Sequence, residues 1–251
     1  MNLAELTWVD AKEVIQKAQV ALLPVGSTEN HGPHLPLGTD WFTAQRIAEI
    51  TGKKGGWLVL PTIPIGVSDH HRQFWGTLWV PPDVLRDYVV AVARALASHG
   101  MRRVVFVNGH GGNRSALTEA VRLLRQETIF AYVHNWWVGI GDMLEKLFPE
   151  PAAHAGPVET SAVLAINPSL VRQDRYKETS KVDRWSKMVE GVEVGGDTID
   201  FSEAGNVGNP STATAEKGTQ LFEAAAENLH RFCTWLAEQS DEALSPKPHK
   251  P

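Results

Sequence analysis

The chain has 251 residues, of which 43% are hydrophobic and 21% charged, and its net charge is −5 at neutral pH. This composition is typical of a globular protein that can bury a full core, and it lacks the basic patch expected of a protein that binds nucleic acid or an anionic membrane. A single cysteine, Cys233, excludes an internal disulfide and favours a reducing compartment. No secretory leader or membrane-spanning run is evident, so we expect a cytoplasmic protein with no membrane partner.

Apolar, β-branched runs alternate with helical periodicity along the chain. The runs predict buried strands at 20–25, 57–63, 103–108 and 128–134. The periodicity predicts helices at 41–51, 82–99 and 114–126, and a long C-terminal helix at about 214–239. This alternation is typical of an α/β protein in which helices flank a mainly parallel central sheet. The carboxyl ends of the strands then share one edge, where such sheets bind ligands.

Residues 1–240 are expected to form a single layered domain, followed by a flexible tail at 241–251. Within the domain, the segment 172–212 is polar, rich in glycine and poorly periodic. Such a segment predicts a long excursion from the core, either a hairpin, a lid or a contact between subunits.

The loop after the first predicted strand carries four metal-binding side chains, Glu29, His31, His34 and Asp40. Glu29 and His31 point to the same side of an extended segment, so both can face one ion. Asp40 precedes a helical pattern, and a helix cap is an equally good interpretation of that position alone. Packing does not require four such groups in one loop, so the stretch indicates a metal site.

A second loop, Asn108-Gly109-His110-Gly111-Gly112-Asn113, ends the strand at 103–108. Its glycines allow a sharp turn, and the strand would direct His110 into the crevice at the sheet edge. Asn113 is a candidate cap for the next helix. A phosphate cradle is a weaker interpretation of this turn, because no Walker lysine or full dinucleotide fingerprint accompanies it.

A third stretch, His154-Ala155-Gly156-Pro157-Val158-Glu159, predicts a helix that begins at Pro157. Glu159 would lie in the first turn, where the helix dipole favours a carboxylate, and it is also a candidate metal ligand. His154 is a candidate for moving protons. The candidate ligands are thus Glu29, His31, Asp40, His110 and Glu159. This set suffices for two ions that share a carboxylate, and nitrogen and oxygen ligands without thiolate suit Zn²⁺, Mn²⁺ or Fe²⁺.

Two pairs of residues are candidate substrate contacts. His71 and Trp75 lie in a segment that follows the strand at 57–63 and emerges at the same edge of the sheet. Trp136 and Trp137 follow the strand at 128–134 and suggest an aromatic wall, although core anchoring is the more ordinary role of tryptophan.

On these motifs the sequence resembles the creatininase (creatinine amidohydrolase) family. The resemblance rests on Gly26–Asp40, Asn108–Asn113, His71 with Phe74–Thr77, and His154–Ser161, in the right order along the chain. It implies a creatininase-like layered α/β fold and a two-metal hydrolytic site that acts on an amide-type C–N bond. It also implies a homo-oligomer, often a hexamer.

The resemblance further implies a division of the ligands. Glu29, Asp40 and His110 would bind one ion, and His31 and Asp40 the other, with Asp40 bridging. Family members that hydrolyse creatinine carry a glutamate two residues after the histidine of the second motif, where this chain has Gly112. We expect Glu159 to supply the missing ligand.

The predicted function is therefore metal-dependent hydrolysis of a non-peptide C–N bond, in a cyclic amide, amide or formamide of a small molecule. A metal-bridging hydroxide would attack the carbon, and His154 would pass a proton to the leaving nitrogen. Gly112 weakens the case for creatinine as the substrate. A peptidase or a deformylase in a cofactor biosynthetic pathway is one alternative, and a non-catalytic metal-binding oligomer is another.

Overall fold

A four-stranded parallel sheet forms the centre of the molecule in the computed structural model, which describes residues 1–149, 153–182, 187–194, 196–247 and 249. The strands are β1 (Ala21–Val25), β2 (Leu58–Val59), β3 (Arg103–Asn108) and β4 (Phe130–Asn135), in the order β2-β1-β3-β4. Leu23 of β1 pairs with Phe106 of β3, which pairs with Val133 of β4. Every residue of β1 is buried, as expected for a strand covered on both faces. The predicted fold class is confirmed.

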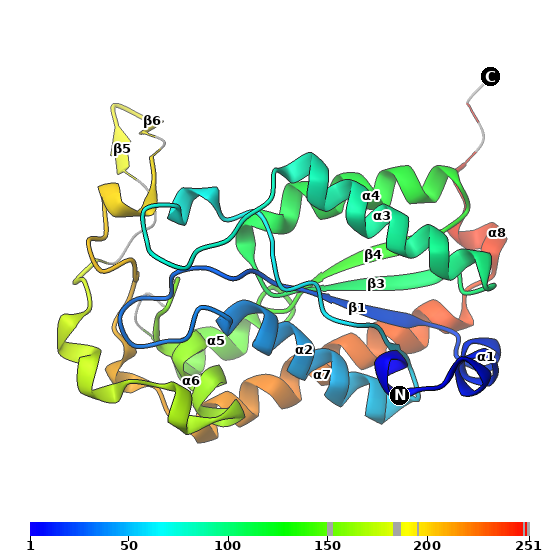
Figure 1. Cartoon of the computed structure of the whole chain (residues 1–251), viewed down its shortest axis with the longest axis horizontal. Coiled ribbons are helices and arrows are strands. Elements are labelled where there is room, and N and C mark those ends of the chain that lie inside the picture. The colour runs from blue at the N-terminus through cyan, green and yellow to red at the C-terminus, as the bar shows by residue number, and fades with distance from the viewer. Residues whose placement is uncertain (150–152, 183–186, 195, 248, 250–251) are drawn as a thin grey trace.

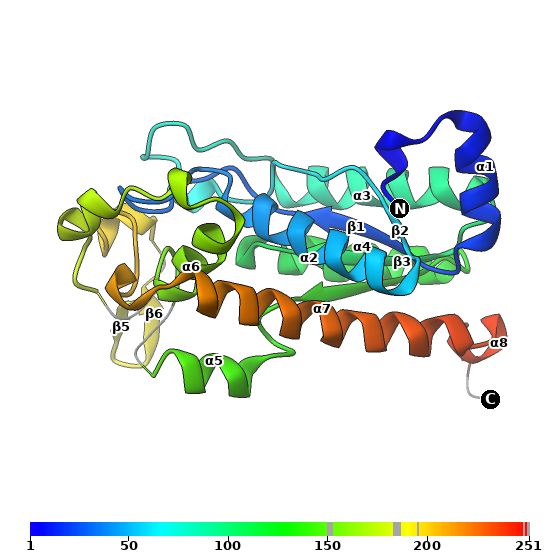
Figure 2. The ribbon, with the colours of Figure 1, turned by 90° about the horizontal axis from the view of Figure 1, so that it is seen from below.

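Helices cover the two faces of the sheet (Figures 1 and 2). On one face, α3 (Pro82–Ser98) and α4 (Arg114–Gln126) pack against alternate strand residues such as Leu23 and Phe106. On the other face, α2 (Thr39–Gly55), α6 (Pro157–Ile166) and α7 (Ala215–Glu238) pack against Leu22 and Val105. The period-2 alternation of strand side chains therefore divides the core into two apolar layers.

The observed elements differ from the predicted ones where local chemistry overrides periodicity. The strand predicted at 57–63 is reduced to β2, because Pro61 cannot donate to a ladder. The helix predicted at 41–51 continues past Gly52, where a Cβ atom would lie 2.5 Å from the side chain of Val59. It ends at Gly55 and is capped by Gly56, whose φ is +72°. Gly52 is therefore required for close packing against Val59 and does not terminate the helix.

Besides short 3-10 turns, the described residues form further elements outside the central layers. These are α1 (Trp8–Lys17), α5 (Gly141–Leu147), α8 (Asp241–Leu244) and an antiparallel hairpin of β5 (Lys187–Val189) and β6 (Val192–Val194). The hairpin alternative for the excursion at 172–212 is confirmed, and the hairpin lies at the same end of the molecule as α6 (Figure 1). The segment placed at the start of the expected tail forms α8, with Leu244 buried in the core. Residues 248, 250 and 251 of that segment lie outside the described residues.

None of the described helices combines the length and the hydrophobicity needed to span a bilayer.

Candidate metal centre

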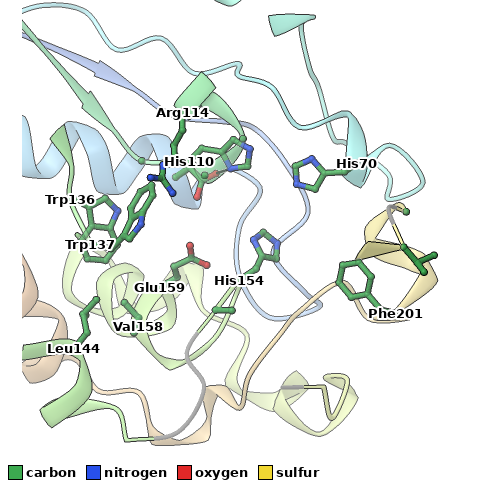
Figure 3. Close-up of a pocket in the computed structure, with 17 residues that line it drawn as sticks. His70, His110, Arg114, Trp136, Trp137, Leu144, His154, Val158, Glu159 and Phe201 are labelled. Atoms are coloured by element: carbon green, nitrogen blue, oxygen red, sulfur yellow. Dashed lines mark ion pairs between the residues drawn. The ribbon is translucent and has the colours of Figure 1, made fainter. Parts of the chain in front are cut away.

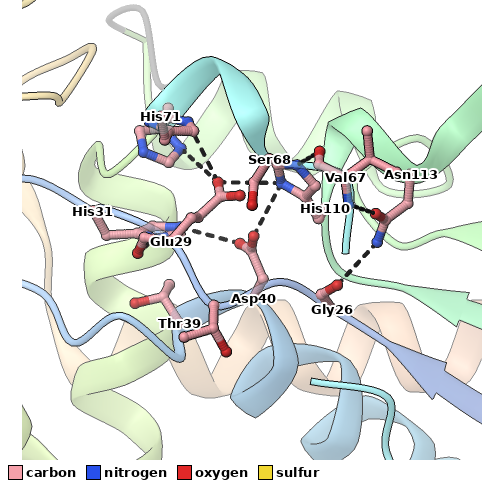
Figure 4. A network of polar contacts seen from close by, with 12 residues as sticks. Gly26, Glu29, His31, Thr39, Asp40, Val67, Ser68, His71, His110 and Asn113 are labelled. Carbon is pink, nitrogen blue, oxygen red and sulfur yellow. Dashed lines mark hydrogen bonds and ion pairs between the residues drawn. The ribbon is translucent and has the colours of Figure 1, made fainter. Parts of the chain in front are cut away.

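The five candidate ligands converge at the carboxyl end of the sheet. Glu29 and His31 follow β1, and His110 follows β3. Asp40 lies in the first turn of α2, and Glu159 lies in the first turn of α6. Figure 4 shows Glu29, His31, Asp40 and His110 pointing toward one another. Parallel topology thus places segments that are distant in the sequence at one edge of the sheet.

One group of ligand atoms is formed by Glu29, Asp40 and His110. The His110 Nδ1 atom lies 3.2 Å from Glu29 Oε1 and 3.0 Å from Asp40 Oδ2. Ligand atoms bound to one ion at about 2.0–2.2 Å lie about 3–3.5 Å apart in a tetrahedral arrangement. The spacing of these three side chains therefore suits a single divalent ion.

A second group is formed by His31, Asp40 and Glu159. The His31 Nε2 atom lies 3.1 Å from Asp40 Oδ1 and 3.6 Å from Glu159 Oε2. Asp40 thus presents one carboxylate oxygen to each group, and Glu159 stands where the second group needs a further oxygen. This is the arrangement that two ions sharing a bridging carboxylate require.

Several carboxylate oxygens in this cluster fit a metal better than any protein partner. Both oxygens of Glu29 and the Oδ2 atom of Asp40 are buried, and among the described residues they accept no hydrogen bond. A buried carboxylate without such bonds is costly unless a cation neutralises it. The donors are imidazole nitrogens and carboxylate oxygens, a set that suits Zn²⁺, Mn²⁺ or Fe²⁺.

Hydrogen bonds to the backbone select the ring nitrogen that each histidine presents. The Nε2 atom of His110 donates to the Val67 carbonyl at 2.9 Å, which leaves Nδ1 facing the carboxylates. The Nδ1 atom of His31 lies 3.1 Å from the Glu29 carbonyl, which leaves Nε2 facing Asp40. Partners of this kind orient metal ligands in proteins.

The structure contradicts the helix-cap interpretation of Asp40, and at Asn113 it confirms the N-cap position but not a capping hydrogen bond. The N-cap of α2 is Gly38, and Asp40 turns its side chain to the histidines. Asn113 stands at the N-cap of α4 without a capping bond, but its side chain donates to the Gly26 carbonyl at 3.0 Å and accepts from the Val67 amide at 2.9 Å. Asn113 therefore ties the loop of His110 to two neighbouring segments, as Figure 4 shows.

The cluster strongly favours bound positive charge. Burial disfavours the charged imidazole of His31, but the charge and hydrogen bond of Asp40 raise its pKa to about 10. Burial also opposes the charging of His110, while Glu29 and Asp40 raise the pKa of that ring well above its ordinary value. Burial would raise the pKa of Asp40, but the two histidines hold it below its usual range. An ion of higher charge can satisfy the same carboxylates.

Gly112 has no room for a side chain. A Cβ atom there would lie 2.2 Å from the Val67 carbonyl oxygen and 2.6 Å from His110 Nε2. The position two residues after His110 is therefore closed to a side chain in this backbone, and among the described residues the nearest carboxylate to His31 other than Asp40 is that of Glu159.

His154 faces the cluster from a third segment. Its Nε2 atom donates to the Asn30 carbonyl at 2.6 Å, and its Nδ1 atom lies 3.7 Å from Glu29 Oε1. Burial and the positive charge of His31 lower the pKa of His154 well below its ordinary value, so the ring is neutral. Its Nδ1 atom also belongs to a third potential ligand group with Glu29 and His31.

A cavity of about 620 Å³ opens onto the cluster, and Asp40, His110, His154 and Glu159 line it. Trp136 and Trp137 form one wall, with ring centroids 6.1 Å apart and ring planes perpendicular. Figure 3 shows His70 and Phe201 on the other side of the cavity. The structure thus brings the two predicted tryptophans to the same cavity as the ligand cluster.

The other two predicted substrate contacts do not line this cavity. His71 is buried behind the ligands, with Nε2 3.5 Å from Glu29 Oε1. Trp75 is 99% exposed. His34, in the first motif, is also outside the ligand groups, and its Nε2 atom lies 3.0 Å from the Thr160 hydroxyl.

His70, Arg114 and Phe201 are among the cavity-lining residues that could not be predicted from the sequence. His70 stacks on the ring of His110 at a centroid distance of 5.8 Å, and its only signal was its position beside His71. Arg114 directly follows the second motif, and nothing in the sequence distinguishes it from an ordinary helix residue. Phe201 lies in the excursion, and no periodicity there indicated which residues approach the sheet edge.

The fold and the site define a hydrolase whose candidate metal ligands sit at the edge of a parallel α/β sheet. The chain belongs to the creatininase family: the family model described as "Creatininase: Creatinine amidohydrolase" matches residues 4–233. The similarity to the family seen in the sequence is thus confirmed.

Three similar proteins illustrate the relationship. A mycofactocin precursor peptide peptidase from Mycobacterium tuberculosis (strain CDC 1551 / Oshkosh) is 36% identical over 228 residues, which is 86% of each protein. A creatinine amidohydrolase from Pseudomonas putida is 27% identical over 245 residues, which is 90% of this chain and 93% of the relative. The solved structure "Creatininase Mn" has a TM-score of 0.84 at 25% identity and covers 95% of this chain and 99% of its own.

Proposed function

We propose that this chain is a metal-dependent peptidase that hydrolyses an amide bond in a short peptide. The observation that carries the proposal is the 620 Å³ cavity with the ligand cluster at its surface, because this volume accommodates several residues of a peptide and exceeds what one small ring needs. The 36% identity to a peptide peptidase, compared with 27% to a creatinine amidohydrolase, supports the same choice. The absence of space at Gly112 separates the ligand set further from that of the creatinine-hydrolysing branch.

The proposed cofactors are two divalent ions, Zn²⁺, Mn²⁺ or Fe²⁺. Glu29, Asp40 and His110 would hold one, and His31, Asp40 and Glu159 the other. Bound there, the ions would supply an activated water and positive charge for the developing oxyanion. Asp40 fixes the two ligand groups relative to each other.

His154 is the proposed proton carrier. Its Nε2–H is committed to the Asn30 carbonyl, so the Nδ1 lone pair faces the cluster. This nitrogen can accept a proton from the attacking water and deliver it to the nitrogen of the departing amine. Trp136 and Trp137 form the wall along which the peptide lies, and they reduce the access of bulk water.

Metal removal tests the proposed function. A panel of tetrapeptides to hexapeptides, creatinine and an N-formyl amine is incubated with the purified protein, before and after treatment with a chelator, and products are identified by mass spectrometry. We expect peptide hydrolysis that the chelator abolishes and that added Zn²⁺ or Mn²⁺ restores. Faster turnover of creatinine than of any peptide, or hydrolysis unaffected by the chelator, would contradict the proposal.

We also propose that the protein acts as a homo-oligomer in the cytoplasm. Trp75 is 99% exposed, and Leu78 and Trp79 beside it are 52% and 44% exposed. Three large apolar side chains in one short loop favour burial against a second copy. Light scattering on the purified protein should give a mass several times 27.6 kDa, with a hexamer expected from the family resemblance. A monomeric mass would contradict this part of the proposal.

A further inference from the structure

Arg114 is the single lysine or arginine among the described residues that line the cavity. It is the first residue of α4 and directly follows the loop that carries His110. Figure 3 shows its guanidinium directed toward the cavity, on the side where Trp136 and Trp137 lie. Its position therefore puts a fixed positive charge beside the space that a substrate would fill.

Among the described residues, the charge of Arg114 has no ion-pair partner. In the part of the chain that the structure describes, no carboxylate lies within the 4.0 Å that defines an ion pair with Arg114. The two carboxylates that line the cavity, Asp40 and Glu159, are directed at His110 and His31. With Asp40 and Glu159 engaged in this way, Arg114 is available to an anionic ligand.

Hydrogen bonds fix the backbone immediately before Arg114. The preceding residue, Asn113, bonds to Gly26, Val67 and Asn108 through its side chain, and Asn108 in turn accepts from the His110 amide at 3.1 Å. The Cα atom of Arg114 thus has a defined position relative to His110. A group that contacts the guanidinium would be placed at a reproducible distance from the ligand cluster.

We propose that Arg114 binds a carboxylate of the substrate, namely the free C-terminal carboxylate of the peptide. This inference rests on the proposed peptidase function and specifies the part of the peptide that the site recognises. A guanidinium offers a planar fork that matches a carboxylate with two parallel hydrogen bonds. The apolar wall of Trp136, Trp137, Leu144 and Val158 would accept the side chain of the terminal residues. The enzyme would therefore cleave close to the carboxyl end of its substrate.

A matched pair of peptides tests this inference. The panel peptide that is hydrolysed fastest is prepared as the free acid and as the C-terminal amide, and kcat and KM are measured for both. We expect the intact protein to prefer the acid by about tenfold to a hundredfold in kcat/KM, mainly through KM, which is the range for a charge-assisted bidentate contact. In Arg114→Gln the preference should fall to about one, because only the acid loses a contact.

Two controls make the result specific. Arg122→Gln removes the same charge from an exposed position further along α4 that does not line the cavity, and the acid preference should remain. Arg114→Lys keeps the charge without the fork and should retain part of the preference. Circular dichroism and metal analysis establish that each variant folds and loads alike. If Arg114→Gln keeps the full preference, or the intact protein shows none, the inference is wrong while the peptidase function stands. If neither peptide form is hydrolysed by the intact protein, the proposed function itself fails.

Discussion

Replacing Asp40 by asparagine should remove both metal ions and reduce hydrolysis by about 1,000-fold or more. Asp40 is the residue that presents one oxygen to His110 and the other to His31, at 3.0 Å and 3.1 Å. The amide keeps the shape of the side chain but loses the charge that both ligand groups share. Loss of the positive charge that stabilises the transition state has a kinetic cost of at least this order. Elemental analysis after dialysis and the peptide assay measure the two effects.

His110→Ala is the matched comparison for this prediction. It removes a ligand from the group with Glu29 but leaves the distances between His31, Asp40 and Glu159 unchanged. We expect one ion per chain to remain in His110→Ala and none in Asp40→Asn, with the secondary structure of both variants intact by circular dichroism. Two ions retained in Asp40→Asn would show that this carboxylate does not bridge. Two ions retained in His110→Ala would show that His110 is not a ligand.

The sheet and most of its helices could be predicted because their signals are local. Strands β1, β3 and β4 are short apolar runs, and α3, α4 and α7 carry regular apolar spacing with clear ends. The shortening of β2 follows from Pro61, whereas the end of α2 depends on the packing of Gly52 against Val59. Gly52 looks like a helix stop in the sequence, and only the packing of Val59 against it shows why the helix continues. A single sequence does not contain that information.

The ligand cluster could be predicted because residues of metal-binding type are concentrated in short segments, and such a concentration indicates a metal site. Glu29, His31 and Asp40 lie close together in the sequence between β1 and the first turn of α2, and both His110 and Glu159 lie just after a glycine. The cavity wall was harder to predict, because its members are ordinary residues in ordinary elements. Arg114 occupies a helix position like that of any surface arginine, and its role depends on the direction of α4 relative to the cavity. Trp75, in contrast, had a motif signal and still lies outside the cavity.

Replacing His154 by glutamine should lower kcat for peptide hydrolysis by about 100- to 10,000-fold while both metal ions remain bound. The glutamine amide can still donate to the Asn30 carbonyl, so the loop keeps the contact that His154 Nε2 makes at 2.6 Å. It cannot accept and release a proton, which is the step assigned to Nδ1. Because the binding wall of Trp136 and Trp137 is unaltered, KM should change little.

The same substitution at His134 provides the control for this prediction. His134 is largely buried in β4, where its Nε2 atom lies 3.2 Å from Asn228 Oδ1, and burial lowers its pKa to about 4. It does not line the described cavity, so His134→Gln should retain kcat within about a factor of two to three. The third ligand group joins His154 to Glu29 and His31, and it defines the competing hypothesis that His154 is a metal ligand. That hypothesis predicts a lower metal content for His154→Gln. If His154→Gln loses one ion per chain, His154 acts as a ligand, and the proton must be carried by another group that faces the cavity.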